Sequence, residues 1–204
     1  MEKKTNTEIK INEQNPNVLN DYLEAVRDGD EDRIASASKA LSIIIIDRVS
    51  DAIKLLYKND IFLLENKMNE MTICGRLAMY LQEEFKDFKG YYVDIEYYRL
   101  KVPREKANLK NDRIRCDILF HSRGASNSRV DNLLAIEVKL EDNPDDGGKD
   151  LSRLEEFVMP ETIDTPENAV HSTLVGLFLR FGEKCSAMRV IPVDINVDIE
   201  DCES

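Results

Sequence analysis

The segment Leu133–Leu140 constrains the fold of this chain more than any other, because it combines the pattern of a buried strand with two charges. Of its eight residues, only Glu137 and Lys139 are polar. Side chains alternate between the two faces of a strand, so one face is apolar and carries Leu134, Ile136, Val138 and Leu140. The opposite face carries Glu137 and Lys139 beside Leu133 and Ala135. Burying charge is costly, so we expect compensating groups near this pair.

A second segment, Ile114–His121, repeats the design. Its predicted apolar face consists of Ile114, Cys116, Ile118 and Phe120, and its opposite face carries Arg115, Asp117, Leu119 and His121. The turn-rich residues 122–128 between the two segments predict an antiparallel hairpin that brings Asp117 close to Glu137.

Two carboxylates placed this way favour a cation between them. At about 4 Å they repel each other by roughly 4 kcal/mol at an effective dielectric constant near 20. A divalent ion removes that repulsion, and oxygen ligands suit Mg²⁺ or Mn²⁺. Lys139 would then lie beside the metal, able to orient or deprotonate a water. The alternative is an ordinary edge strand whose charged face is solvated.

A third carboxylate, Glu70, belongs to a predicted helix over residues 66–85. The helix has one apolar stripe at helical spacing, which consists of Ile73, Cys74, Leu77, Ala78 and Leu81. At 100° per residue, Glu70 falls in the middle of that stripe, where an unpartnered glutamate is uncommon. The alternative is an acidic residue of the first turn that the helix dipole favours.

These residues, in this order, resemble the PD-(D/E)xK nuclease superfamily, which has the restriction-endonuclease-like fold. The resemblance covers about residues 69–181 and includes four segments that look like a group of small bacterial members: Val93–Arg99, Asp117–Gly124, Asn132–Lys139 and Lys149–Leu154. One departure is Cys116, which stands where the name-giving proline would precede Asp117.

The resemblance implies a fold, an activity and a set of ligands. The fold would be α/β, with a mixed central β-sheet flanked by helices and an N-terminal helical extension. Glu70, Asp117, Glu137 and the Val138 carbonyl would hold Mg²⁺ or Mn²⁺, and Lys139 would orient the attacking hydroxide or neutralise the transition state. The expected activity is metal-dependent hydrolysis of phosphodiester bonds, in DNA rather than RNA. The alternative is an inactive nuclease-fold module that acts through a protein partner.

The charge distribution bears on the nucleic-acid substrate. The net charge of −12 argues against phosphate binding, yet residues 99–129 contain nine Lys or Arg against three acidic residues and flank the expected site. A basic stretch there suits a phosphodiester. The candidates for substrate contact are Arg99, His121, Arg123 and Lys149; solvated surface residues are the alternative for each.

The chain divides into an N-terminal tail with a helical extension (residues 1–60) and a nuclease-like domain (residues 61–200). Predicted helices cover residues 17–27, 32–58 and 149–157, and further strands cover residues 91–102, 174–181 and 188–197. Polar or acidic loops and tails are expected at residues 1–16, 103–112, 141–148 and 198–204. The helix at 32–58 is apolar on more than one side, which indicates central packing or a contact with a second copy or a protein partner.

The remaining features concern location and other metal chemistry. No apolar run approaches the roughly 18 residues of a membrane span, and the polar N-terminal sequence does not resemble a signal peptide. Four cysteines without zinc spacing predict reduced thiols in a cytoplasmic protein, and the presence of only two histidines argues against a His-based metal site.

Overall fold

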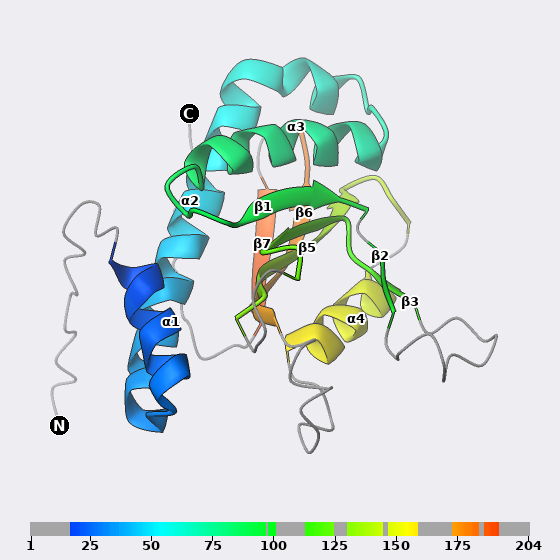
Figure 1. Ribbon diagram of the computed structural model, residues 1–204. Coiled ribbons are helices and arrows are strands. Elements are labelled where there is room, and N and C mark those ends of the chain that lie inside the picture. Colours follow the sequence, from blue (N-terminus) through cyan, green and yellow to red (C-terminus); the bar gives the residue numbers. More distant parts are fainter. Residues whose placement is uncertain are drawn as a thin grey trace, which may run out of the picture.

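The protein is an α/β protein in which N-terminal helices precede a five-stranded mixed sheet with a flanking helix (Figure 1). The computed structural model describes residues 17–96, 98–100, 113–124, 130–144, 147–158, 173–183 and 186–191. The sequence-based predictions for residues 1–16, 103–112 and 198–204, and for the part of 188–197 beyond Ile191, lie outside these ranges.

Three helices form the part of the chain described between residues 17 and 84, and local signals set their ends. Helix α1 (Val18–Asp28) ends at Gly29, whose φ of +70° is the left-handed conformation that glycine adopts without strain. Helix α2 (Glu31–Glu65) begins at Asp30, whose side chain accepts a hydrogen bond from the Arg33 amide. Helix α3 (Glu70–Glu84) begins in the same way, because the Asn69 side chain accepts from the Thr72 amide.

The central sheet has the strand order β1-β4-β5-β6-β7, and its members are β1 (Tyr92–Ile95), β4 (Ile118–His121), β5 (Asn132–Leu140), β6 (Thr173–Phe181) and β7 (Ser186–Ile191). Strands β5 and β6 are parallel, and the other neighbours are antiparallel. Helix α4 (Gly148–Val158) lies between β5 and β6 in the chain. Strands β2 (Tyr98–Leu100) and β3 (Arg113–Arg115) form a separate two-stranded sheet.

Two apolar clusters stabilise the layers. The larger one joins α1, α2 and α3 to one face of the sheet, and the smaller one joins α4 to the other face (Figure 1). Helix α2 packs against α1, α3 and β6, and its Ile45, Ile46 and Val49 are fully buried. This confirms that the helix is apolar on more than one side. The residues assigned to the helical extension and the sheet therefore share one core.

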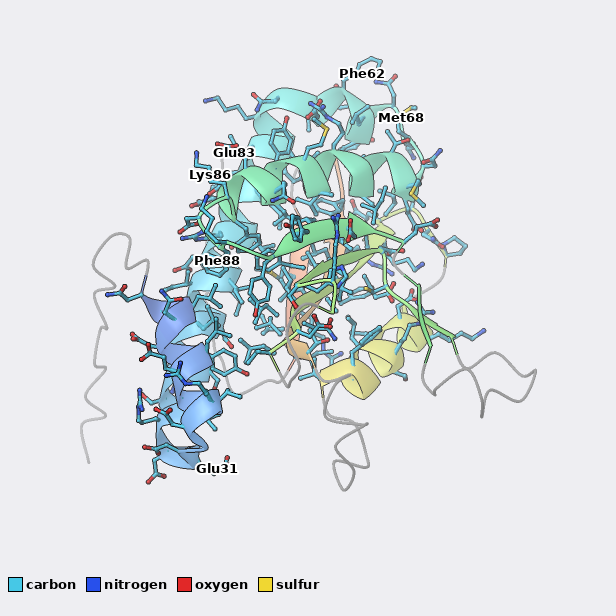
Figure 2. All side chains as sticks on the ribbon, in the orientation of Figure 1. Glu31, Phe62, Met68, Glu83, Lys86 and Phe88 are labelled. Atoms are coloured by element: carbon cyan, nitrogen blue, oxygen red, sulfur yellow. The ribbon has the colours of Figure 1, made fainter. Side chains whose placement is uncertain are left out.

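Few large apolar side chains remain exposed on the described surface. Phe62 is 65% exposed and Met68 37%, and Figure 2 shows both at the outer corner where α2 meets α3. Within the described ranges, none of the helices combines the length and apolar character needed to span a membrane.

Two predicted strands are broken, and one break changes which residues share a face. The chain leaves regular strand geometry at Cys116 and Asp117, between β3 and β4. As a result, Cys116 packs with Leu119 in the smaller cluster, whereas Ile118 and Phe120 belong to the larger one. The prediction that Cys116 shares their face was therefore wrong.

The strand predicted over residues 91–102 breaks at Glu96, whose φ is +47°. The Glu96 amide donates to the Asp117 carbonyl at 2.9 Å, so both breaks occur at one point, where the chain passes from the central sheet to the small one. Strand β5 follows the predicted alternation except at Leu133, which joins the larger cluster beside an irregularity in the β4–β5 register.

Helix α3 begins at Glu70 rather than at the predicted residue 66, because α2 extends to Glu65.

Candidate active site

The antiparallel pairing of β4 and β5 places Asp117 beside Glu137. Ile118 is in register with Ile136, so the preceding residue, Asp117, lies level with Glu137, and the predicted hairpin is confirmed. The Val138 amide donates to Asp117 Oδ2 at 2.8 Å. Glu137 is only 2% exposed.

The two carboxyl groups are an unfavourable pair as anions. Burial, together with the nearby charge of Asp117, raises the pKa of Glu137 to about 8. Burial also raises the pKa of Asp117, although the hydrogen bond from the Val138 amide opposes this. The pair therefore retains a proton near neutral pH, which shows that positive charge at this point would be stabilising.

Helix α4 supplies two charged residues that complete the surroundings. Arg153 Nη1 lies 2.7 Å from Glu137 Oε1, and Arg153 Nη2 lies 3.1 Å from Asp150 Oδ1. Asp150 Oδ2 is in turn 3.0 Å from Lys139 Nζ. Asp150 and Arg153 were not among the predicted site residues, although both lie in the segment Lys149–Leu154 that contributes to the family resemblance. Asp150 shares the buried stripe of α4 with Leu154 and Phe157, so the pattern that singles out Glu70, an acidic residue within an apolar stripe, also singles out Asp150.

Glu70 reaches the same end of β5 from the start of α3. Its Oε2 lies 3.6 Å from Lys139 Nζ. Its Oε1 accepts from Asn143 Nδ2 at 2.8 Å and from the Leu140 amide at 3.3 Å. The cap at Asn69 fixes where α3 begins and thereby places Glu70 at this end of β5. The apolar stripe of the helix had predicted that Glu70 faces inward.

The site therefore contains an excess of carboxylates. Four of them face two cationic side chains: Glu70, Asp117, Glu137 and Asp150 against Lys139 and Arg153. Fully ionised, this group carries a net charge that one divalent cation would balance. Its donors are oxygens, as Mg²⁺ or Mn²⁺ requires, so the chemistry of the donor set fits such an ion.

The present positions of these side chains differ from those of a formed metal centre. Among the described residues, no three His, Cys, Asp or Glu side chains converge on a point where an ion could bind. Arg153 and Lys139 hold the carboxylates instead. An ion at this site therefore requires side-chain rearrangement.

The described residues form a small pocket and a larger one near this end of β5. A pocket of about 280 Å³ opens onto the carboxylates and is lined by Asn69, Glu70, Met71, Cys74, Glu96 and Asp117. Burial and the charges of Asp117 and Glu70 raise the pKa of the Cys74 thiol, so this thiol stays protonated.

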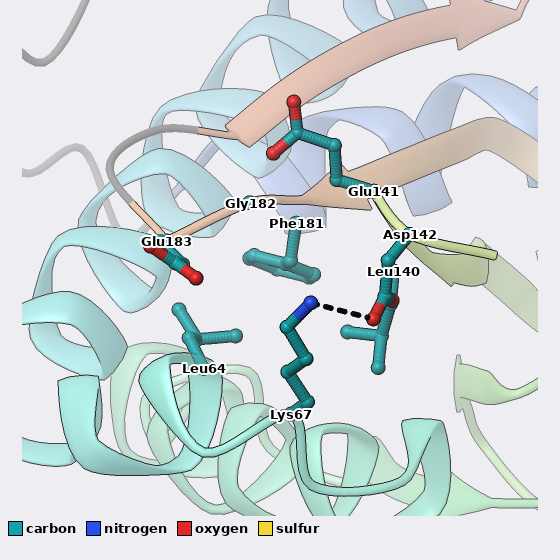
Figure 3. A pocket seen from close by; sticks show the side chains of 8 residues that line it. All are labelled: Leu64, Lys67, Leu140, Glu141, Asp142, Phe181, Gly182 and Glu183. Carbon is teal, nitrogen blue, oxygen red and sulfur yellow. Dashed lines mark ion pairs between the residues drawn. The ribbon is translucent and has the colours of Figure 1, made fainter.

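A larger pocket of about 490 Å³ borders the site at Leu140, which follows Lys139 (Figure 3). Its apolar floor includes Leu64 and Phe181, and Lys67 Nζ extends into it, 3.3 Å from Asp142 Oδ2. Despite its size, this pocket does not contain the carboxylate set, and the smaller pocket is the one that adjoins the chemistry.

His121 and Arg123 lie away from the carboxylates. His121 is the last residue of β4 and Asp117 immediately precedes that strand; four residues of extended chain span about 13 Å. His121 Nε2 lies 3.0 Å from Asp94 Oδ2, and Arg123 Nη2 lies 2.6 Å from Asp94 Oδ1. The Arg123 guanidinium also stacks on Tyr92 at 4.3 Å. The structure therefore assigns both residues contacts at the opposite end of the hairpin.

The other residues predicted to contact the substrate are Lys149 and Arg99. Lys149 is exposed in the first turn of α4, next to Asp150. Arg99 lies in β2, in register with Ile114. Most of the basic stretch 99–129 lies outside the described residues.

Comparisons with protein-family models, with curated proteins and with solved structures found no match.

Proposed function

We propose that this chain is a metal-dependent nuclease with a PD-(D/E)xK, restriction-endonuclease-like core that hydrolyses phosphodiester bonds, with DNA as the expected substrate. The observation that carries the proposal is the placement of Asp117 level with Glu137, with Lys139 two residues further along the same strand. Glu70 reaches the same strand end from α3.

The order of the elements supports the proposal. Helix α3 precedes β1, β4 and β5, which pair antiparallel, and α4 then leads to β6, which is parallel to β5. A helix carrying an acidic residue, a carboxylate hairpin, a second helix and a further strand are the parts that the resemblance to the superfamily implies.

The residues expected to hold the cation are Glu70, Asp117, Glu137 and the Val138 carbonyl. When bound, a divalent ion lowers the pKa of a coordinated water and stabilises charge on the scissile phosphate. The raised pKa of Glu137 and the excess of carboxylates are the electrostatic reason why this group of residues would bind an ion.

Lys139 is suited to act as a cation rather than as a base. Burial opposes its charge, but the bond to Asp150 and the nearby Glu70 raise the pKa of Lys139 overall. The ammonium group therefore stays protonated at neutral pH, orients the attacking water and stabilises the charge that develops on the phosphate. Asp150 holds this ammonium group in place.

The test is cleavage of linear, supercoiled and single-stranded DNA and of RNA, in Mg²⁺, Mn²⁺ or EDTA. Wild type is compared with Glu137→Gln and with the control Glu141→Gln, which changes an exposed glutamate just past the strand end. Cutting by wild type and Glu141→Gln, lost in Glu137→Gln and in EDTA, supports the proposal. Equal cutting by all three proteins would place the activity elsewhere.

A second candidate function is a nuclease-fold binding module without turnover. The observation that favours it is the 2.7 Å contact of Arg153 Nη1 with Glu137 Oε1, because the guanidinium stands where a cation would bind. This candidate predicts that wild type binds DNA, measured by fluorescence anisotropy, and cuts none of the substrates in either metal. Metal-dependent cutting by wild type that is lost in Glu137→Gln would refute this second candidate.

A further inference from the structure

Arg153 holds the carboxylate that the proposed cation needs most. Its Nη1 lies 2.7 Å from Glu137 Oε1, and the Glu137 side chain is only 3% exposed. A charge-assisted hydrogen bond of this length is strong, and burial keeps competing water away from it. In the present arrangement, the guanidinium thus occupies Oε1 of Glu137.

A divalent ion and the guanidinium compete for this carboxylate. Both are positive, and at the separation that one shared carboxylate imposes, like charges repel strongly at low effective dielectric. Asp117 is fixed by the backbone amide of Val138 at 2.8 Å, and Glu137 lies on a central strand between β4 and β6. Arg153 is therefore the member of the group that can give way.

The surroundings of Arg153 allow it to move. Its side chain is 36% exposed, in contrast to Glu137. It also has a second partner, since Nη2 lies 3.1 Å from Asp150 Oδ1, three residues earlier on the same helix. Leaving Glu137 would therefore transfer the guanidinium toward an acidic partner and water rather than bury it without one.

We infer that Arg153 is a positioning residue that occupies Glu137 in the metal-free protein and that a divalent cation must displace it in order to bind. The inference rests on the proposed function, because it takes Glu137 as a ligand of the cation. On this inference, the exchange sets the affinity of the site for the cation, and binding of the ion moves the Arg153 side chain of α4.

The experiment is Mn²⁺ binding to the full-length chain without nucleic acid, followed through the EPR signal of free Mn²⁺. The proteins are wild type, Arg153→Gln, Arg153→Lys, Glu137→Gln and the double variant Arg153→Gln/Glu137→Gln. Lys149→Gln is the control for charge, since it removes one positive charge from the first turn of the same helix, where Lys149 is exposed. Circular dichroism checks that each variant is folded.

We expect Arg153→Gln to bind Mn²⁺ about tenfold or more tightly than wild type, the order expected when a competing bond between charged groups is removed. Arg153→Lys should lie between the two, and Lys149→Gln should differ from wild type by less than about twofold because solvent and salt screen exposed charges. The double variant should bind no better than Glu137→Gln.

The outcomes separate this inference from the proposed function. If Glu137→Gln weakens Mn²⁺ binding but neither Arg153 variant strengthens it, the cation site stands and the exchange is refuted. A gain in Lys149→Gln equal to that in Arg153→Gln would also refute the exchange, since net charge alone would explain it. If no variant binds Mn²⁺, or if Glu137→Gln binds as well as wild type, the proposed cation site falls and the inference falls with it.

Should Arg153→Gln be unfolded, Mg²⁺ titration of wild type followed by NMR gives the same answer. The assigned Nε–H signal of Arg153 should shift with the occupancy of the site. A signal that stays unchanged while the amides of Asp117 and Val138 shift would refute the exchange.

Discussion

Replacing Glu137 with glutamine removes a buried ionisable group and retains its shape, so its effect on stability should depend strongly on pH. Burial and the neighbouring Asp117 raise the pKa of Glu137 from 4.5 to about 8 in the folded protein. In the unfolded chain, the group returns to its ordinary value. The folded state therefore binds a proton that the unfolded state releases over this pH range.

The magnitude follows from linkage between proton binding and folding. Because the folded-state pKa is raised, the stabilisation by protonated Glu137 is fully present below about pH 4.5 and is lost as the pH rises to about 8. In this window, the free energy of unfolding of wild type should fall by about 1.4 kcal/mol per pH unit through this group. Glutamine does not titrate, so the variant should gain on wild type by several kcal/mol, on the order of 4, between pH 5 and pH 8.

The assay is urea unfolding in EDTA at half-unit steps from pH 5 to pH 9, with Glu141→Gln as the matched control. The difference in free energy of unfolding between Glu137→Gln and wild type should be small at pH 5, rise to pH 8 and level off above it. The difference for Glu141→Gln should stay flat. A flat or falling difference for Glu137→Gln would refute the argument that this carboxyl is held protonated by its surroundings.

Three further predictions concern the site and the fold. Asp117→Asn should abolish cleavage in the nuclease assay without lowering the melting temperature in EDTA, because the amide oxygen can still accept from the backbone and the repulsion is removed; a large loss of melting temperature would contradict the site as described. Leu56→Ala, at a fully buried position of α2, should lower the free energy of unfolding measured in urea by about 2–5 kcal/mol. Phe62→Ala, at a position that is 65% exposed, should lower it by less than about 0.5 kcal/mol, and equal losses in the two variants would contradict the packing described. Gly147→Ala should destabilise the fold by about 1–3 kcal/mol, because the φ of Gly147 is +80° and the new Cβ would lie 2.3 Å from a ring carbon of Phe178 in β6. Gly75→Ala in α3 should instead stabilise the fold by about 0.5–1 kcal/mol, since no atom lies within 4 Å of the new Cβ. Melting temperatures that shift in the same direction in both variants would contradict this prediction.

Local patterns in the chain were enough to predict several elements and part of the site. The first helix, the apolar sides of the helix around Ile45 and the alternation in β5 are short-range signals, because backbone conformation and side-chain periodicity depend on neighbouring residues. The hairpin that brings Asp117 level with Glu137 follows from the same signals, since a loop between two alternating segments restricts their pairing.

The same local patterns could not predict contacts between segments that are distant in the sequence. The interruption at Glu96 and Asp117 arises where one carbonyl accepts a bond from a residue 21 positions earlier in the chain, and nothing in either segment alone marks the point where the strands separate. The partner of His121 is also decided in space, because its Nε2 lies 3.0 Å from Asp94 on a different strand.

The sequence by itself determined which residues can form helices and strands, and that a strand with Glu137 and Lys139 needs compensating charge. Only the tertiary structure decided what compensates it, because Arg153 and Asp150 reach the strand from a helix that docks on the sheet through the smaller apolar cluster. Electrostatic partners are chosen by distance in space, and the free energy of burying a charge depends on every group that packs around it.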